Sequence, residues 1–392
     1  MKKIVYVDNN ATTCVDPQVL EVMLPFLKDK YGNPSSMHTF GGRISKDIEK
    51  SREEVAELIG AESPQEIIFT SGGTESDNTA IISSLRVNPE KRHIITTKVE
   101  HPAVLTLCKY LEEEGYKITY LDVDSQGLLD LDQLRESITP ETAIVSIMWA
   151  NNETGVIFPI EEVAKICYER GVVFHTDAVQ AVGKIPLKLK ELPISFLSLS
   201  GHKLHAPKGV GALYVKRGTR FKPFIIGGHQ ERGRRAGTEN VAGIVGLGKA
   251  CQLAKDFMEE ENTRVKYLRD KLEKGILEKI PNIRVNGHRD LRLPNTTNIG
   301  FEFVEGEAIL MLLDDKGICA SSGSACTSGA LTPSHVLRAM GVPFTFIQGS
   351  IRFSLSRHNT QEDIEHILRE LPPIIKRLRE ISPFSPQNLT SA

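Results

Sequence analysis

Between residues 44 and 215, short apolar runs alternate with amphipathic stretches, and this alternation restricts the possible folds more than any other feature of the sequence. The apolar runs are EIIFT (66–70), HIITT (93–97), KITYLDV (117–123), AIVSIMW (143–149), VVFHTD (172–177), FLSLS (196–200) and VGALYV (210–215). Between them, segments such as 44–60 and 160–171 place apolar side chains at helical spacing and end at a glycine. Buried strands that alternate with helices predict an α/β fold with a mostly parallel sheet, covered by helices on both faces.

The pattern changes after about residue 250. A charged helix is expected over about 252–279, followed by NIRVNG, TTNIGFEF, a helix at 306–317, ICASSGSAC, IRFSLS and an amphipathic helix at 360–381. We therefore expect two domains, a large one over 15–255 and a smaller α+β one over 1–14 and 256–380. The polar, proline-containing residues 381–392 are expected to form a loose tail.

The balance of charges and the distribution of cysteines exclude several classes of protein. The 392 residues carry 48 Lys and Arg against 50 Asp and Glu, so we expect neither a nucleic-acid partner nor a membrane surface, which both require a basic face. No run reaches the roughly 18 apolar residues of a membrane-spanning helix. The six cysteines are scattered without a CxxC pair, which argues against a disulfide framework and predicts a reducing compartment, the cytoplasm.

Polar or ionisable residues follow five of the predicted strands. In a doubly wound sheet, binding sites form beyond the carboxyl ends of the strands. The residues at these ends are Ser71–Thr74, Glu100 and His101, Asn151–Thr154, Asp177 and Gln180, and His202 and Lys203. Their convergence at one edge of the sheet predicts a functional site there.

The segment Ser71-Gly72-Gly73-Thr74 is suited to hold a phosphate. Its two glycines allow backbone N–H groups to approach an anion, a helix N-terminus follows, and Thr74 adds a hydroxyl. The same segment also fits an ordinary strand-to-helix turn in which Ser71 or Thr74 caps the helix. On its own, the segment does not decide between the two.

Asp177 ends one apolar strand, and Lys203 follows the next. A buried Asp and a buried Lys can pair as a structural ion bridge. Alternatively, they can hold opposite ends of pyridoxal 5'-phosphate, with the carboxylate on the pyridine nitrogen and the lysine amine on the aldehyde. His101 alone is most often a core or loop histidine, whereas beside these residues it can stack on a flat ring and move protons.

A series of motifs resembles those of cysteine desulfurases of the NifS/IscS type. The motifs are VDNNATT (7–13), YGNPSSMH (31–38), TSGGTESDN (70–78), VEHPAV (99–104), NNETG (151–155), HTDAVQ (175–180), SGHKLHAPKG (200–209), RAGTEN (235–240) and SSGSAC (321–326). They occur in the family's order, from about residue 5 to about residue 380. The resemblance implies a fold-type-I pyridoxal-phosphate enzyme that forms a homodimer, converts L-cysteine to L-alanine and delivers the sulfur to an acceptor such as an iron–sulfur scaffold protein.

The resemblance assigns roles to individual residues. Lys203 is similar to the Schiff-base lysine, Asp177 to the partner of the pyridine nitrogen, and His101 to the catalytic residue that stacks on the ring. Arg352 in IRFSLS matches the clamp on the substrate carboxylate, a task that suits a bidentate guanidinium. The remaining matched positions are Asn152 (cofactor and substrate), Gln180 (ring hydroxyl) and the phosphate-binding Gly73, Thr74, Ser200, His202 and Thr238, the last reaching across from the partner subunit.

Cys326 differs from the other cysteines because it lies in ASSGSACTSGALTP, a Gly/Ser/Thr-rich segment without apolar periodicity. Such a segment predicts a mobile loop. By contrast, Cys108, Cys167 and Cys251 fall in predicted helices, where small buried thiols are expected. Taken alone, Cys326 is an incidental loop thiol, but the resemblance implies that it is the nucleophile that receives the sulfur as a persulfide.

Two rival functions are left open by the sequence. Another fold-type-I activity, such as an aminotransferase or a selenocysteine lyase, uses the same cofactor residues and does not need Cys326. A non-catalytic sulfur-relay or scaffold protein belongs to a different class, and the presence of Lys203, Asp177 and Arg352 argues against it.

No stable metal site made by this chain alone is expected. His202 and His205 have a spacing that can bind a metal, but Lys203 lies between them and no carboxylate or cysteine is near them in the sequence. Nothing near Cys14 in the sequence suggests that its thiol is activated. The resemblance does allow Cys326 to share a cluster transiently with a scaffold partner.

Overall fold

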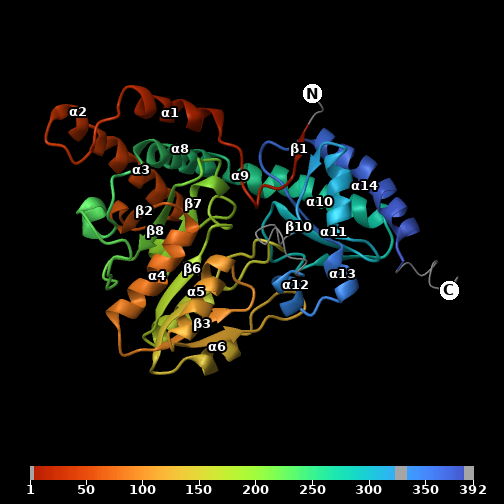
Figure 1. Ribbon diagram of the computed structural model, residues 1–392, viewed down its shortest axis with the longest axis horizontal. Helices are drawn as coiled ribbons and strands as arrows, with labels where there is room; N and C mark the ends of the chain where they lie inside the picture. The colour runs from red at the N-terminus through yellow and green to blue at the C-terminus, as the bar shows by residue number, and fades with distance from the viewer. Residues whose placement is uncertain (1–3, 323–332, 384–392) are drawn as a thin grey trace.

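The computed structural model describes residues 4–322 and 333–383. Within them, a seven-stranded sheet forms the centre of the larger part of the molecule (Figure 1). In spatial order its strands are β2 (Ile67–Thr70), β8 (Gly211–Val215), β7 (Phe196–Ser200), β6 (Val173–Asp177), β5 (Thr142–Ser146), β3 (His93–Thr97) and β4 (Lys117–Leu121). Only β8 runs antiparallel to its neighbours β2 and β7, so the prediction of a mostly parallel sheet is confirmed.

Helices cover both faces of this sheet. The helices of this part are α1 (Pro17–Lys28), α2 (Thr39–Gly42), α3 (Ile44–Ile59), α4 (Gly73–Val87), α5 (Pro102–Glu113), α6 (Leu131–Ser137), α7 (Ile160–Glu169) and α8 (Val241–Asp256). Of these, α1 packs on α8 and α2 on α3, outside the layer that covers the sheet. Adjacent strand residues point to opposite faces: Ile94 of β3 packs in a cluster with α4 and α5, whereas Ile95 belongs to the large cluster formed with α3, α7 and α8. Burial on both faces explains why these strands read as continuous apolar runs.

The C-terminal part contains an antiparallel sheet in the order β12 (Ser350–Ser354), β10 (Thr296–Phe301), β9 (Ile283–Asn286). The N-terminal β1 (Val5–Tyr6) pairs in parallel with β11 (Ile318–Cys319), so the start of the chain joins this part (Figure 1). The accompanying helices are α9 (Met258–Glu260), α10 (Lys266–Lys279), α11 (Gly306–Asp314), α12 (His335–Ala339), α13 (Phe344–Gln348) and α14 (Gln361–Ile381). The apolar side chains of β1, α10, α11 and α14 form a second core with those of β10 and β12.

The prediction of a helix over about 252–279 is wrong at the N-terminal boundary. Instead, α8 begins at Val241, where the Asn240 side chain accepts a hydrogen bond from the Gly243 N–H, and a π-helical turn (Glu261–Val265) precedes α10. The start was missed because most of α8 is buried between α1 and α3, so its sequence lacks the polar face that marks an amphipathic helix. None of the helices in the described ranges is long and apolar enough to span a membrane.

Candidate active site

A cavity of about 360 Å³ lies at the carboxyl ends of the parallel strands. Most residues predicted for the site line it: Gly73, Thr74, His101, Asn152, Asp177, Gln180, Ser200, His202, Lys203 and Arg352. Thr238 does not line it. It is exposed in a neighbouring pocket that it shares with Ser71 and Gly209, and Cys326 lies outside the described residues.

One end of the cavity is suited to an anion. The first turn of α4 opens there, and its N-cap residue, Gly72, provides no side-chain hydrogen bond to the helix. The backbone N–H groups at the start of a helix carry partial positive charge and can hold a phosphate. A side chain at Gly73 would bring a Cβ to 2.8 Å from Val179, so only glycine lets the backbone reach this position. Thr74, Ser200 and His202 surround the helix start.

The cavity also contains a buried carboxylate. Asp177 ends β6, is only 7% exposed, and accepts a hydrogen bond of 2.9 Å from the Val179 N–H. Burial raises the pKa of Asp177 to about 6, and the backbone hydrogen bond and Lys203 oppose this rise. A cation bound beside the carboxylate, such as a protonated ring nitrogen, would stabilise its charged form.

Two further carboxyl groups, those of Asp77 and Glu100, interact with Asp177 but have higher pKa values and are protonated at neutral pH. Asp77 is fully buried in α4, and burial together with the charge of Asp177 raises its pKa well above the usual range. Burial likewise raises the pKa of Glu100 to about 8. At neutral pH, Asp177 is therefore the ionised member of the three, which concentrates the negative charge where a ring nitrogen would bind.

Lys203 ends the short 3₁₀ turn η3 (Gly201–Lys203), which directly follows β7. Its Nζ atom donates hydrogen bonds of 2.5 and 2.7 Å to the backbone carbonyl oxygens of Asn10 and Ala11. The Gln180 amide also donates to the Asn10 carbonyl, at 3.1 Å. The N-terminal segment thus holds the amine within the cavity.

His101 is the N-cap residue of α5, and its Nδ1 accepts a hydrogen bond of 3.1 Å from the Ala103 N–H. Burial, with a smaller contribution from Lys203, lowers the pKa of His101 to about 4, so the ring is neutral at pH 7. Because Nδ1 is an acceptor, the proton of the neutral ring is on Nε2. His101 therefore enters the reaction as a hydrogen-bond or proton donor at Nε2.

Arg352 of β12 reaches the cavity from the C-terminal part. Its Nη2 donates to Asp8 Oδ1 at 2.8 Å, and its Nη1 donates to the Asn152 carbonyl oxygen at 3.0 Å. Its Nε is buried and has no hydrogen-bond partner among the described residues. A buried guanidinium with an unused donor is suited to bind a carboxylate that enters the cavity.

These residues fit pyridoxal phosphate. The cavity offers a helix start for the phosphate, a carboxylate for the ring nitrogen, an amine for the aldehyde and a histidine beside the ring position. Together, these four groups match the phosphate, the ring nitrogen, the aldehyde and the ring face of that cofactor.

Sequence reasoning missed the structural role of Asn10 and Asp8. The Asn10 side chain donates to the Asn152 carbonyl and to Thr296 Oγ1, while its own carbonyl accepts from Lys203. Asp8 pairs with Arg352. The VDNNATT motif contains both residues, but nothing in the sequence indicates that this segment crosses the site.

Among the described cysteines, the predictions of burial are confirmed. Cys108, Cys167 and Cys251 are buried, whereas Cys14 is exposed and Cys319 is partly exposed. All five are free thiols.

Comparisons with known proteins show which family this chain resembles. The family model described as aminotransferase class-V matches residues 5–367. A cysteine desulfurase of Nostoc sp. is 62% identical over 97% of this chain and 95% of its own length, and the cysteine desulfurase NifS of Azotobacter vinelandii is 59% identical over 97% and 94%. A solved structure of a NifS-like protein superposes with a TM-score of 0.90 at 41% identity, covering 96% of this chain and all of that one.

Proposed function

The chain belongs to the class-V aminotransferase family and is a pyridoxal-phosphate-dependent cysteine desulfurase, and on this premise we propose how its own residues divide the reaction. The enzyme converts L-cysteine to L-alanine and retains the sulfur. The observation that supports the division of roles is that Lys203, Asp177 and Arg352 line one cavity.

Arg352 binds the substrate carboxylate and fixes the orientation of L-cysteine. Its guanidinium has a donor without a hydrogen-bond partner among the described residues, and it is held in place by Asp8 and the Asn152 carbonyl. Asn152 lines the same wall of the cavity. Fixing the carboxylate places the Cα–H bond toward Lys203, and such positioning lowers the entropic part of the barrier.

The bound cofactor supplies an aldehyde that links covalently to the amino group and a protonated ring that accepts the electrons of the broken Cα–H bond. Asp177 keeps the ring nitrogen protonated because its buried carboxylate needs a cation. With the cofactor bound, Gln180 would donate to the ring hydroxyl, His101 would lie against the ring, and Lys203 Nζ would take the proton from Cα. The phosphate is held by the start of α4 with Thr74 and Ser200.

Cys326 receives the sulfur. Its thiolate attacks the substrate sulfur, so that an S–S bond forms as the C–S bond breaks, and the electron pair of the C–S bond stays on the former Cβ. That carbon takes a proton and becomes the methyl group of alanine, Lys203 would return a proton to Cα, and Cys326 carries the persulfide. His101, through its Nε2–H, would be the proton or hydrogen-bond donor on the side of the cavity that holds the cofactor ring. The assignment of Cys326 is supported by the SSGSAC motif.

The assembly of the protein is also part of the proposal. Exposed apolar side chains of α1 and the segment after it, namely Leu20, Leu24, Leu27, Tyr31 and Phe40, support a homodimer, in which Thr238 reaches the partner's phosphate. The separate core of β1, β10, β12, α10, α11 and α14 supports a small domain over 1–14 and 256–380 beside a large one over 15–255, although α12 and α13 add side chains to the large cluster. The free thiols support a reducing compartment, the cytoplasm, and the acceptor is an iron–sulfur scaffold protein.

The experiment that tests this function measures both products. The purified protein, supplied with pyridoxal phosphate, L-cysteine and a reducing thiol, should form alanine and sulfide in equal amounts, and Lys203→Ala should form neither. An aminotransferase would instead require a keto-acid acceptor, and a selenocysteine lyase would act on selenocysteine but not on cysteine. A scaffold protein would turn over none of these compounds. Any of these three results would refute the proposal.

A further inference from the structure

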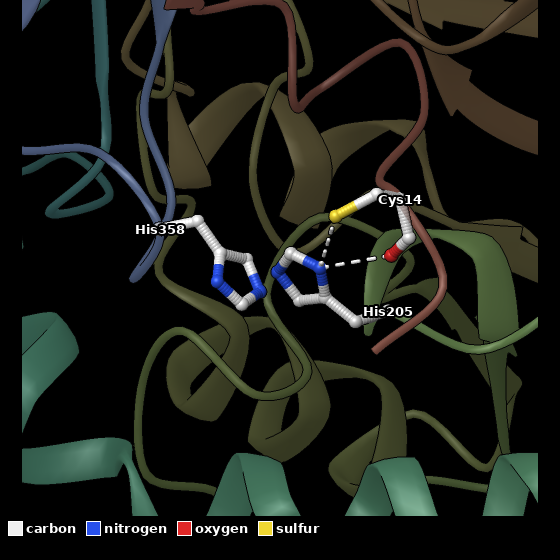
Figure 2. A group of neighbouring side chains, drawn as sticks. All are labelled: Cys14, His205 and His358. Atoms are coloured by element: carbon white, nitrogen blue, oxygen red, sulfur yellow. Dashed lines mark hydrogen bonds between the residues drawn. The ribbon is translucent and has the colours of Figure 1, made fainter. Parts of the chain in front are cut away.

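Outside the cavity, three side chains that can bind a metal lie together although they are far apart in the sequence (Figure 2). Cys14 follows the N-terminal segment, His205 comes two residues after Lys203, and His358 lies between β12 and α14. One potential ligand atom from each residue lies within 4.8 Å of the other two. Cys14 and His358 are exposed and His205 is buried, so an ion can enter from solvent.

The buried histidine has an unused lone pair. His205 is 1% exposed, and its Nδ1 lies 3.0 Å from the Cys14 carbonyl oxygen. A carbonyl oxygen can only accept, so Nδ1 carries the proton and Nε2 has a free lone pair. Nε2 is buried and has no hydrogen-bond partner among the described residues.

This arrangement is typical of a metal-binding histidine. Such histidines usually donate their second ring N–H to a carbonyl or carboxylate, which fixes the tautomer and the ring orientation. The ring of His205 lies between the Cys14 side chain and the ring of His358 (Figure 2), with Cys14 Sγ 3.8 Å from Nδ1 and the two ring centroids 4.8 Å apart. A polar atom left unsatisfied in the interior is uncommon, and a bound cation would satisfy it.

Backbone and side-chain contacts already hold the three segments together. The His205 N–H donates to Thr13 Oγ1 at 2.9 Å, and the Asp16 N–H donates to the His205 carbonyl oxygen at 3.0 Å. Arg357, the residue before His358, donates to Asp16 Oδ2 at 2.8 Å. These contacts hold the three segments close together before any ion binds.

We propose that Cys14, His205 and His358 form a binding site for a thiophilic d¹⁰ cation, of which Zn²⁺ is the representative. Zn–S and Zn–N bonds of about 2.3 and 2.0 Å place neighbouring ligand atoms roughly 3.3–3.8 Å apart, so the three groups, whose ligand atoms lie within 4.8 Å of one another, need to move closer together. The Cys14 thiol loses its proton to solvent on binding, and water fills the fourth position.

The types of ligand atom at this site also exclude cations that prefer oxygen ligands. Mg²⁺ and Ca²⁺ require oxygen ligands, whereas a thiolate and two imidazoles suit Zn²⁺ or Cu⁺. Arg357 and Lys184 add positive charge near His205, which the Asp16 carboxylate and the Cys14 thiolate offset. The proposal departs from the sequence-based expectation of no stable metal site, because the fold places Cys14 beside His205, where the local sequence has no cysteine.

The site would join the two parts of the molecule beside the catalytic lysine. A bound ion links the N-terminal segment and the loop after Lys203 to the segment before α14. Ions that bind only the folded state raise its stability. We therefore expect zinc binding to be measurable without turnover, independently of the proposed desulfurase reaction.

The test measures zinc bound by holoenzyme in a Cys326→Ser background, which removes the loop thiol as a competing ligand. Equilibrium dialysis against buffered Zn²⁺ should give one zinc per chain with a micromolar or tighter Kd. Cys14→Ser and His358→Gln should each weaken binding at least about tenfold. The matched controls Cys319→Ser and His366→Gln should bind as tightly as the parent.

A second measurement separates loss of the site from loss of the fold. Zn²⁺ should raise the thermal midpoint of the parent and of both controls, but not that of Cys14→Ser. Co²⁺ should give a thiolate-to-metal charge-transfer band in the parent and none in Cys14→Ser. The proposal is overturned if the parent binds no zinc below millimolar concentration, or if Cys14→Ser and His358→Gln bind it as tightly as the controls.

Discussion

Replacing Arg352 by lysine tests how the substrate is held. The guanidinium is 2% exposed, and two of its nitrogens are occupied by Asp8 Oδ1 at 2.8 Å and the Asn152 carbonyl at 3.0 Å. Its Nε has no partner among the described residues. Lysine keeps the positive charge beside Asp8, so the substitution removes the planar fork without leaving that carboxylate unpaired.

The expected loss follows from the hydrogen bonds that lysine cannot make. A single ammonium group cannot hold Asp8 and chelate a substrate carboxylate at the same time, so about one charge-assisted hydrogen bond is lost. Such a bond contributes roughly 1.5–3 kcal/mol. At 1.4 kcal/mol for each tenfold change, kcat/KM for L-cysteine should fall about 10- to 150-fold.

The assay combines this variant with a substrate analogue that has no carboxylate. Alanine formation gives kcat/KM for L-cysteine, and the visible absorption of the bound cofactor reports the binding of cysteamine, which lacks the carboxylate. Arg352→Lys should bind cysteamine as well as the wild type does, because cysteamine has no carboxylate to contact residue 352 in either protein. An unchanged kcat/KM, or an equal loss for both compounds, would refute the carboxylate-binding role.

Two further predictions concern the cofactor site and the fold. Because the pKa of Asp177 is raised to about 6, the carboxylate is ionised above that pH and protonated below it. The affinity of the cofactor-free protein for pyridoxal phosphate should therefore decrease as the pH falls below about 6, and Asp177→Asn should remove that part of the pH dependence, as measured by cofactor titration. Gly248→Ala should lower the free energy of unfolding by about 1–3 kcal/mol, because the new Cβ would lie 2.7 Å from Ser51. Urea denaturation measures this change, with Gln252→Ala, exposed on the same helix, as a control expected to have little effect.

The strand ends could be predicted from the sequence because their signals are local. Each apolar run marks a strand buried on both faces, and in parallel strands the residues after the runs must meet at one edge. The sequence pattern therefore predicts that Asp177, Lys203 and His101 lie at one edge of the sheet. The prediction of the α8 boundary failed because a helix buried on most sides has no amphipathic pattern.

Contacts between distant segments could not be predicted in the same way. Cys14 and His205 are separated by 191 positions, and no pattern in either segment indicates the other. Similarly, Asp8 lies beside Arg352 only because β1 joins the C-terminal part and carries the following residues across the site. Such contacts depend on topology, which residue spacing along the chain does not encode.

The most direct test of the proposed mechanism is the location of the sulfur after one turnover. When the holoenzyme reacts with sulfur-labelled L-cysteine without a reducing thiol, the label should be found on the peptide that contains Cys326, and a reducing thiol should release it. Cys326→Ala should retain the visible cofactor absorption and should still exchange the Cα proton, but it should carry no label and form no alanine, because a soft nucleophile is then missing. If the label is found on another cysteine, or if Cys326→Ala forms alanine and sulfide at the wild-type rate, the persulfide role of Cys326 is contradicted.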